Sequence, residues 1–176
     1  MSEFEEGVSL EKYVELAKEM GAIDAKVIDT STIVVENWVR LKCLYGCKRT
    51  GNTYSCPPNN NITPDEMRIV ISEFSYALLI KIDRWSKVYK LVYDMERRVF
   101  LDGNRKAFGL VAGACNLCPV CALKDKLPCR KPDLLRPAME AVGIDVFETA
   151  KNNGYELKVV TCEEDARAYF GIVLCY

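Results

Sequence analysis

Residues 76–111 read YALLIKIDRWSKVYKLVYDMERRVFLDGNRKAFGLV and predict a strand, a long helix and a second strand in succession. Tyr76–Ile82 is a nearly continuous apolar run of strand length, which is typical of a buried strand. Between Ser86 and Phe100, apolar side chains recur every three or four residues while cations lie off that stripe, which predicts an amphipathic helix. Phe108–Val111 is again short and apolar, so we expect a second strand there. The helix should be the longest in the chain.

The segment before this unit carries further helix and strand signals. Apolar residues at helical spacing predict a helix over Leu10–Met20 that ends at Gly21, and Ala25–Val35 favours a strand or short hairpin leading into Asn37–Arg40. Thr63–Glu66 supplies a cap, a proline at the first helical position and a glutamate three residues after the cap. These features together mark the start of another helix.

The segment after this unit is predicted to add two short helices and two strands. The helices span Pro137–Val142 and Asp145–Asn152, and the strands, which should pair in one sheet, span Glu156–Thr161 and Phe170–Cys175. We therefore expect an α+β or mixed α/β fold in which helices pack on a central mixed sheet. With 176 residues, 49% of them hydrophobic, we expect a single domain over residues 1–176.

Directly after the second strand of the opening stretch, Gly113–Pro132 reads GACNLCPVCALKDKLPCRKP. Cys115, Cys118 and Cys121 are each two residues apart and Cys129 follows after seven more, a spacing similar to the cysteine run of bacterial-type ferredoxins. We call these four residues the first cysteine set. Each two-residue spacer lets the backbone curl around a cluster, so three thiolates can face one iron–sulfur core. The ferredoxin run has three residues before its last cysteine and a proline after it, so the fourth ligand stays open here.

A second cysteine set precedes the first. Cys43 and Cys47 are three residues apart, and Cys56 follows after eight more residues, with two prolines behind it. The spacing before Cys56 excludes the C-x3-C-x2-C motif of radical S-adenosylmethionine enzymes. Three thiolates could still face one centre, unless these are ordinary cysteines near a turn. Two fully cysteine-ligated clusters need eight thiolates and the two sets hold seven, so Cys129 could complete either site.

The nine cysteines occur in a chain without histidine, the commonest metal ligand in proteins. Any bound metal must therefore use thiolates or carboxylates. Cys162 and Cys175 each stand alone near the end of an apolar strand, so we expect them to pack as core residues. The acidic N-terminus lacks the order of a signal peptide and no apolar run of 18 residues follows, so we expect a soluble cytoplasmic protein with reduced cysteines.

The net charge of -1 and an isoelectric point near 5.7 give no reason to expect binding to nucleic acid or to a membrane. Cations nevertheless gather around the first cysteine set, at Lys124, Lys126, Arg130, Lys131 and Arg136. Arg130 and Lys131 are the residues that we expect to contact the cofactor, because a thiolate-ligated cluster carries negative charge. A solvated basic face and a docking surface for an acidic redox partner are the alternatives.

Zinc is the alternative to an iron–sulfur cofactor, because a site with four thiolates suits either. Zinc ribbons bring together two separated C-x2-C pairs, whereas three cysteines crowd into seven residues here. This crowding favours a 4Fe-4S cluster on the first cysteine set. The second set could hold another cluster, and if no fourth thiolate joins it, one iron would keep an open position.

These motifs resemble those of a family of predicted metal-binding proteins found largely in anaerobic archaea and bacteria. The resemblance rests on both cysteine sets, on the prolines after Cys56, on the Arg130-Lys131-Pro132 that follows Cys129, and on Met139–Val146, and it covers nearly the whole chain. It implies metal binding through these cysteines and an anaerobic cytoplasm, with no known substrate. We interpret Met139–Val146 itself as a packing or capping segment.

The sequence supports three functions. The leading one is an iron–sulfur protein that transfers electrons to a redox partner protein. The second is an enzyme whose three-cysteine cluster offers an open iron to a small molecule, for example in sulfur transfer or dehydration. The third is an interaction module stabilised by zinc. The sequence indicates no substrate and no oligomeric state.

Overall fold

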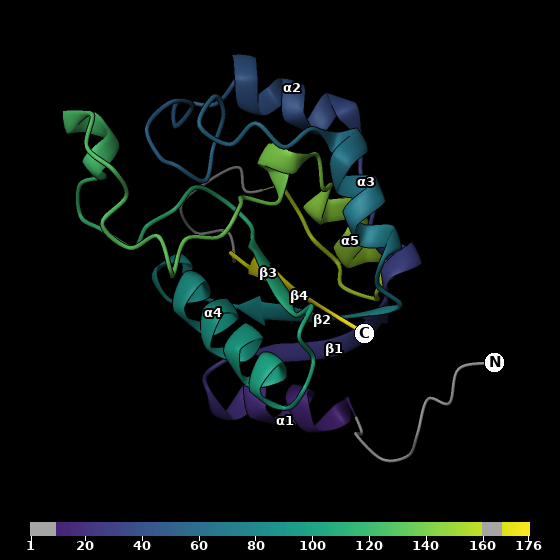
Figure 1. Cartoon of the computed structure of the whole chain (residues 1–176). Coiled ribbons are helices and arrows are strands. Elements are labelled where there is room, and N and C mark those ends of the chain that lie inside the picture. The colour runs from purple at the N-terminus through teal and green to yellow at the C-terminus, as the bar shows by residue number, and fades with distance from the viewer. Residues whose placement is uncertain (1–9, 160–166) are drawn as a thin grey trace.

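A computed structural model describes residues 10–159 and 167–176 of the chain (Figure 1). Within these residues it contains five α-helices, three short 3-10 helices and one sheet of four strands. The α-helices are α1 (Glu11–Glu19), α2 (Asn37–Tyr45), α3 (Pro64–Ser72), α4 (Trp85–Leu101) and α5 (Val146–Asn152). The strands are β1 (Asp24–Asp29), β2 (Tyr76–Ile82), β3 (Phe108–Val111) and β4 (Tyr169–Cys175), and the 3-10 helices are η1 (Thr30–Thr32), η2 (Ala122–Asp125) and η3 (Glu140–Val142).

The strands lie in the order β1-β2-β4-β3, and each of these three pairings is antiparallel. The expected α+β fold, with helices packed on a central sheet, is confirmed. The sheet is antiparallel, however, where we expected a mixed one. β2 and β3, which α4 connects, run in the same direction, but β4 inserts between them and pairs with both. The last strand of the chain therefore lies in the interior of the sheet.

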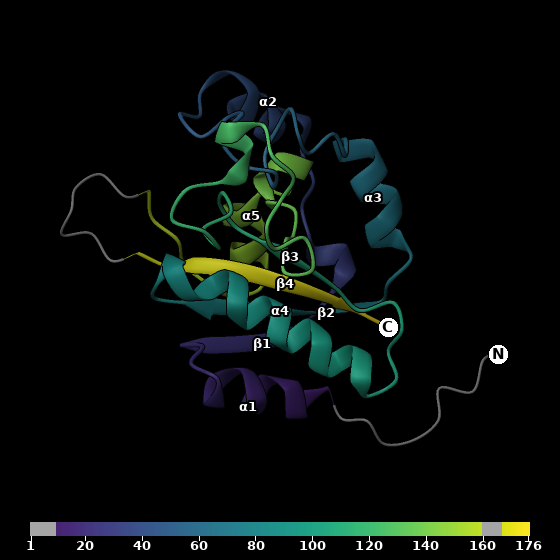
Figure 2. The same ribbon diagram turned by 60° about the vertical axis from the view of Figure 1, so that its left-hand side comes forward.

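Helices cover both faces of the sheet, as Figures 1 and 2 show. α1 and α4 pack on one face, and α3, α5 and η3 pack on the other. Alternate residues of β2 divide between the two cores, because Leu78 and Ile80 pack with α1 and α4, whereas Ala77 and Leu79 pack on the opposite face. Tyr76–Ile82 is therefore apolar almost throughout, since both faces of this strand are covered.

Two glycines let α4 lie close against the sheet. A Cβ atom on Gly171 would overlap Cγ2 of Val92, and one on Gly109 would lie 2.7 Å from Cγ1 of the same valine. Glu96, also on α4, accepts a hydrogen bond from the Gly109 amide at 2.8 Å and pairs with Arg136. Arg136 is 9% exposed, so this member of the predicted basic group is a buried structural residue.

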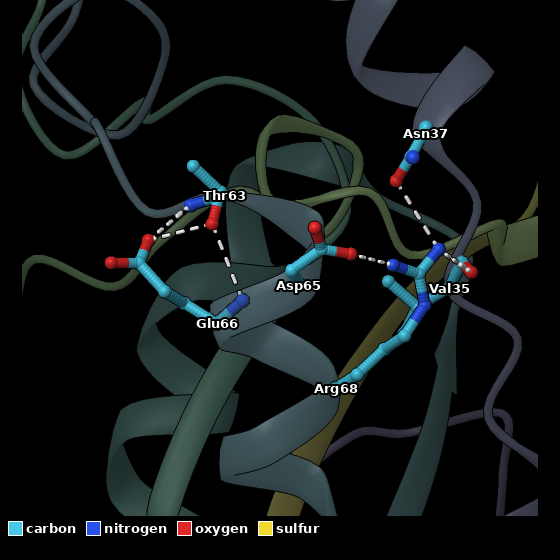
Figure 3. A network of polar contacts seen from close by, with 6 residues as sticks. All are labelled: Val35, Asn37, Thr63, Asp65, Glu66 and Arg68. Atoms are coloured by element: carbon cyan, nitrogen blue, oxygen red, sulfur yellow. Dashed lines mark hydrogen bonds and ion pairs between the residues drawn. The ribbon is translucent and has the colours of Figure 1, made fainter.

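The first turn of α3 is closed by the capping box that the sequence predicts (Figure 3). Thr63 Oγ1 accepts a hydrogen bond from the Glu66 amide at 3.2 Å, and the Glu66 carboxylate accepts one from the Thr63 amide at 2.8 Å. Arg68 then donates to the Val35 carbonyl at 2.8 Å and to Asn37 Oδ1 at 3.2 Å. Because Asn37 is the first residue of α2, α3 fixes the point at which α2 begins.

Most predicted elements are confirmed, with small shifts at their ends. The helices over Leu10–Met20, Ser86–Phe100 and Asp145–Asn152 correspond to α1, α4 and α5, and α4 is the longest of the five. The helix expected over Pro137–Val142 is shorter and is the 3-10 turn η3. Within the described residues, no helix combines the length and the apolar character needed to cross a lipid bilayer.

One prediction for the flanking segments is wrong, and another is confirmed only in part. The strand expected over Glu156–Thr161 is missing at residues 156–159, which are irregular, while residues 160 and 161 lie outside the described residues. β2 and β3 occupy both edges of β4, so this segment could not have paired with β4 as expected. The strand expected over Ala25–Val35 is present as β1, but it ends at Asp29, where η1 follows, and the residues from Asn37 onward form helix α2.

Candidate metal centre

The first cysteine set lies on a loop that leaves the sheet at the end of β3. At the start of this loop Gly113 has φ +86°, and a Cβ there would lie 3.2 Å from Nε1 of Trp85, so glycine suits the turn in two ways. The Gly113 amide donates to Glu140 Oε2 at 2.9 Å, and Asn116 Nδ2 donates to the Trp85 carbonyl at 2.6 Å. The start of the loop is thereby tied to α4 and to η3.

The four cysteines of the first set line a single cavity of about 20 Å³. The rest of the lining is formed by Tyr54, Leu117, Ala122, Arg130, Lys131 and Leu135. Each of the four thiols is partly exposed. Cys129 therefore lies beside the other three cysteines of its own loop, although seven residues separate it from Cys121.

Arg130 and Lys131 brace the same loop through its backbone. Lys131 Nζ donates to the Leu117 carbonyl at 2.8 Å, and Arg130 donates to the Val120 carbonyl at 3.2 Å. The Arg130 guanidinium also lies 3.8 Å from the carboxylate of Asp125. Two cations thus border the cavity, and their contact with a cofactor stays a prediction.

The second cysteine set begins in the last turn of α2 and continues through the loop that follows. Cys43 lies on α2 itself, and its carbonyl accepts a hydrogen bond from the Thr50 hydroxyl. Cys47 is exposed, and its sulfur accepts a hydrogen bond from the Arg49 amide at 3.4 Å. Cys56, in contrast, is buried. The second set therefore extends from the protein interior to its surface.

Two polar side chains, the partly exposed Arg40 and the buried Asn60, hold the second set against the rest of the protein. Arg40 of α2 donates to the carbonyls of Ile62 at 2.7 Å and Asn60 at 3.2 Å, and also to the carbonyl of Ala141. The Asn60 side chain in turn donates to the Ser55 carbonyl at 3.1 Å. Because Ala141 belongs to η3, these bonds connect α2, the cysteine loop after it and η3.

The two cysteine sets meet at Ser55. Its Oγ accepts a hydrogen bond from the Cys115 amide at 2.8 Å and lies 3.6 Å from the sulfur of Cys56. The Thr53 hydroxyl lies 3.0 Å from the same Oγ, and Ser55 is 1% exposed. One buried hydroxyl therefore links the first set to the second.

Burial raises the pKa of thiols in both sets. For Cys115 it is the main cause of a pKa of about 11, to which charge on the other three cysteines of its set contributes, while a hydrogen bond from the Leu117 amide opposes the rise. The pKa of Cys43 is raised to about 12, mainly by burial and then by the charge of Glu140, while Arg40 opposes the rise. Burial also raises the pKa of the Glu140 carboxyl. A metal must therefore displace protons from these thiols, and its binding should weaken as pH falls.

The type of donor fits a thiolate-bound metal, although the thiols that the structure describes are not arranged around a metal position. Four cysteines surround one cavity, three more lie on the neighbouring loop, and the eight cysteines within the described residues are free thiols. In residues 10–159 and 167–176, no group of three or more cysteine, aspartate or glutamate side chains is arranged to hold a metal ion. Cys175 is buried in the core, as predicted, and Cys162 lies outside the described residues.

A larger hollow of about 720 Å³ lies between η1, α3 and the start of β2, and none of these seven cysteines lines it. Its charged side chains are engaged within the protein. Ser31 lowers the pKa of the Asp29 carboxyl by hydrogen bonds from its side chain and from its amide, the latter at 2.8 Å, and Arg68 holds the start of α2. The cysteine loops are therefore the stronger candidate for the functional site.

Two residues of the candidate site were not predicted in this role. Ser55 directly precedes Cys56, but its contact with the Cys115 amide spans 60 positions of the chain. Glu140 belongs to the expected packing segment, whereas its carboxylate holds the Gly113 turn. In the same segment the capping interpretation is right, because Asp145 accepts a hydrogen bond from the Glu148 amide at the start of α5. No local sequence signal marks a bond between distant loops.

Replacing Ser55 with alanine should lower the free energy of unfolding by about 1–3 kcal/mol, because the Cys115 amide loses its acceptor. The measurement is urea denaturation of the purified protein under anaerobic conditions. Ser72→Ala is the matched control, since the exposed Ser72 hydroxyl donates only to a carbonyl in its own helix. Its effect should stay within about 0.5 kcal/mol. Equal stability of Ser55→Ala and the wild type would contradict the bridging role.

Comparison with known proteins agrees with this chemistry. No curated protein and no solved structure matches the chain. A family model described as predicted metal-binding protein (DUF2284) matches residues 26–175, which include both cysteine sets, Ser55 and Glu140. The chain therefore belongs to this family of predicted metal-binding proteins.

Proposed function

We propose that the protein binds iron–sulfur clusters and transfers electrons to a redox partner protein. One 4Fe-4S cluster would bind to the first cysteine set and a second to Cys43, Cys47 and Cys56. The observation that carries the proposal is the cavity lined by all four cysteines of the first set. A bound cluster supplies one-electron redox chemistry at a site where thiolates are its ligands. The proposal assigns this work to the anaerobic cytoplasm, where thiols stay reduced.

The surroundings of the first set suit a negatively charged cofactor. Arg130 and Lys131 line the same cavity and are held there by hydrogen bonds to the loop backbone. Nearby cations stabilise the negative charge that a thiolate-ligated cluster carries. The Leu117 amide hydrogen bonds to the Cys115 sulfur and would also stabilise this negative charge.

The contact between the two sets suits the passage of electrons from one site to the other. Cys115 and Cys56 both approach the Ser55 hydroxyl, one through its amide and the other through its sulfur. Cys56 is buried, whereas Cys47 in the same set is exposed. Electrons could therefore enter or leave at the surface near Cys47 and reach the first set through the protein interior.

An enzyme with an open iron at the second set is the alternative. It is favoured by the position of Cys129 on the cavity of the first set, because this leaves three cysteines at the second. A cluster with three protein thiolates keeps one position for a small molecule, as catalytic metal sites do. A non-protein ligand bound at that iron would support this function over electron transfer.

The proposal predicts a brown protein that contains both iron and acid-labile sulfide. The test is expression and purification without oxygen, followed by analysis of iron, zinc and sulfide and by a visible spectrum. About eight irons per chain indicate two cubane clusters, and about four indicate one. A colourless protein that contains zinc but no sulfide would contradict the proposal and favour a structural zinc module.

A further inference from the structure

Helix α2 turns an apolar face away from the rest of the protein. Trp38, Leu41 and Tyr45 recur at intervals of three and four residues and are 47%, 54% and 86% exposed, while Val39 faces the interior. Leu44, on the same helix, is 38% exposed. Large exposed apolar side chains at helical spacing mark an interaction surface, since folding alone does not bury them.

The cysteine-bearing segments are strongly basic, although the whole chain is nearly neutral. Residues 37–60 and 113–132 together contain eight lysines and arginines and one carboxylate, that of Asp125, which leaves 16 cations and 24 carboxylates for the remainder. Seven of the eight cations are exposed, at Lys42, Lys48, Arg49, Lys124, Lys126, Arg130 and Lys131. The exception, Arg40, is only partly exposed and binds backbone carbonyls. Positive charge therefore concentrates around the two cysteine sets.

The basic segments and the apolar face form one end of the molecule. The Tyr54 hydroxyl donates to the Leu127 carbonyl at 2.7 Å, which joins the loop after α2 to the loop that carries η2. In Figures 1 and 2 both α2 and the green η2 turn lie in the upper part of the molecule, and Figure 1 shows the η2 loop projecting to the left of α2. On the η2 loop, Val120 and Leu127 are 52% and 51% exposed. We call this end, with the exposed Cys47 within it, the cysteine end.

We propose that the cysteine end docks a small acidic electron-carrier protein, an inference that rests on the proposed function. Protein interfaces combine an apolar centre with a polar rim, and the exposed apolar side chains and cations of this end match that composition. An acidic carrier would meet the complementary charge that steers association. In each encounter with a reduced carrier, the carrier loses one electron and the thiolate-bound centre gains it. With an oxidised carrier, the electron passes from the centre to the carrier.

Protein is favoured over nucleic acid by the kind of apolar side chains that are exposed. Single-stranded nucleic acids bind by stacking their bases on aromatic rings along a basic groove. Here four of the six large apolar side chains named are aliphatic, at Leu41, Leu44, Val120 and Leu127. The Trp38 ring is also covered on one face by Lys42, whose Nζ lies 4.7 Å from its centroid. Such a surface offers apolar packing rather than a stacking platform.

Flavodoxin, an acidic electron carrier, is the probe for this proposal. Its oxidised form is titrated anaerobically into the purified protein in a calorimeter, at low and at high salt. We expect saturable binding at low salt that weakens at high salt, as screening predicts. Charge reversal by Lys42→Glu with Lys48→Glu should weaken binding at low salt at least tenfold. Leu41→Ser with Tyr45→Ser should weaken it at both salt concentrations.

Arg105→Glu with Lys106→Glu provides the matched control. It makes the same change in net charge at the turn after α4, and α4 has 17 residues, so this turn lies about 25 Å along the helix axis from Trp85. Flavodoxin should bind this variant as it binds the wild type. Absence of wild-type binding at low salt, or equal losses in the control and the Lys42→Glu Lys48→Glu variant, would overturn the proposal.

Two further measurements test whether this surface binds nucleic acid and whether the protein holds zinc. The first measurement is the binding of a single-stranded oligonucleotide. If the oligonucleotide binds tightly and in a salt-dependent way, if only the cysteine-end variants lose this binding, and if flavodoxin does not bind, the surface belongs to nucleic acid and the proposal is overturned. Chemical analysis of iron and sulfide is made on the same preparation. If the protein binds flavodoxin but contains zinc without sulfide, the proposed function is refuted and the docking surface stands. If it contains an iron–sulfur cluster but does not bind flavodoxin, the docking surface is refuted and the proposed function stands.

Discussion

Replacing both Cys118 and Cys121 with alanine is expected to abolish metal binding at the first cysteine set. Two of the four thiols that line the cavity are then lost, and the remaining pair cannot enclose a cluster. If both sets carry cubane clusters, the content of iron and acid-labile sulfide should fall by about half. If only the first set carries a cluster, the content should fall below about a tenth of that of the wild type. Metal analysis after anaerobic purification measures this loss.

Cys175→Ala is the control for the cysteine substitutions. Cys175 lies in the core on β4, paired with Tyr76 of β2, and is 2% exposed. Its variant should keep the full iron content and lose some stability. Cys129→Ala should lose the same cluster as the double variant. Full iron retention in Cys129→Ala would refute its assignment as a ligand, and full retention in the double variant would refute the site.

Replacing Gly143 with alanine should destabilise the protein by about 3 kcal/mol, the sum of a strained backbone and a steric clash. Gly143 has φ +91°, and a Cβ there would lie 2.8 Å from two carbons of Pro64 and 3.2 Å from the Glu36 carbonyl oxygen. Pro64 begins α3, and the Glu36 amide donates to the Gly143 carbonyl at 2.7 Å. A side chain would therefore push η3 away from the starts of α2 and α3.

Gly21→Ala separates the two causes of this loss. Gly21 has φ +105°, but a Cβ there would have no atom within 4 Å. Alanine at Gly21 should therefore cost about 1 kcal/mol through the backbone alone. In thermal unfolding, a loss of about 3 kcal/mol corresponds to a fall of about 6–12 °C in Tm for a chain of this length. Equal effects of the two variants would show that η3 and α3 are not in tight contact.

The elements that form the middle of the fold follow from the local sequence. α4 shows the periodicity of a helix because its apolar stripe packs on the sheet, and β2 shows a continuous apolar run because both of its faces are covered. β4 is also recognisable from its apolar run, but its place between β2 and β3 is not. Strand order depends on which edges are free after the other strands have paired, and no single segment records that.

Helix α2 shows why an apolar pattern alone can mislead. The regular spacing of Trp38, Leu41 and Tyr45 lies on the exposed side, and Val39 is the buried residue of the helix. Its position is fixed by Arg40 and Arg68, which bind backbone carbonyls of other segments. These polar contacts are between residues far apart in the chain, so they leave no periodic signal.

The cysteines of the candidate site are recognisable from their spacing, whereas its architecture is not. Metal-ligand spacing is a local property, because a short loop must present its thiols together. The approach of the two loops depends instead on Ser55 and Glu140, which bond to Cys115 and Gly113 over 60 and 27 positions of the chain. Sequence alone leaves Cys129 able to join either set, and the fold brings it to the cavity of the first.

The polar attachment of α2 has a consequence for the dynamics of the second cysteine set. A helix that buries one side chain and is held by arginines has little apolar contact to oppose local unfolding. Its amides should therefore exchange with solvent deuterium sooner than those of α4, which buries six residues. Because Cys43 lies on α2 and Cys56 in the interior, a metal bound between them would act as a clamp that slows this exchange.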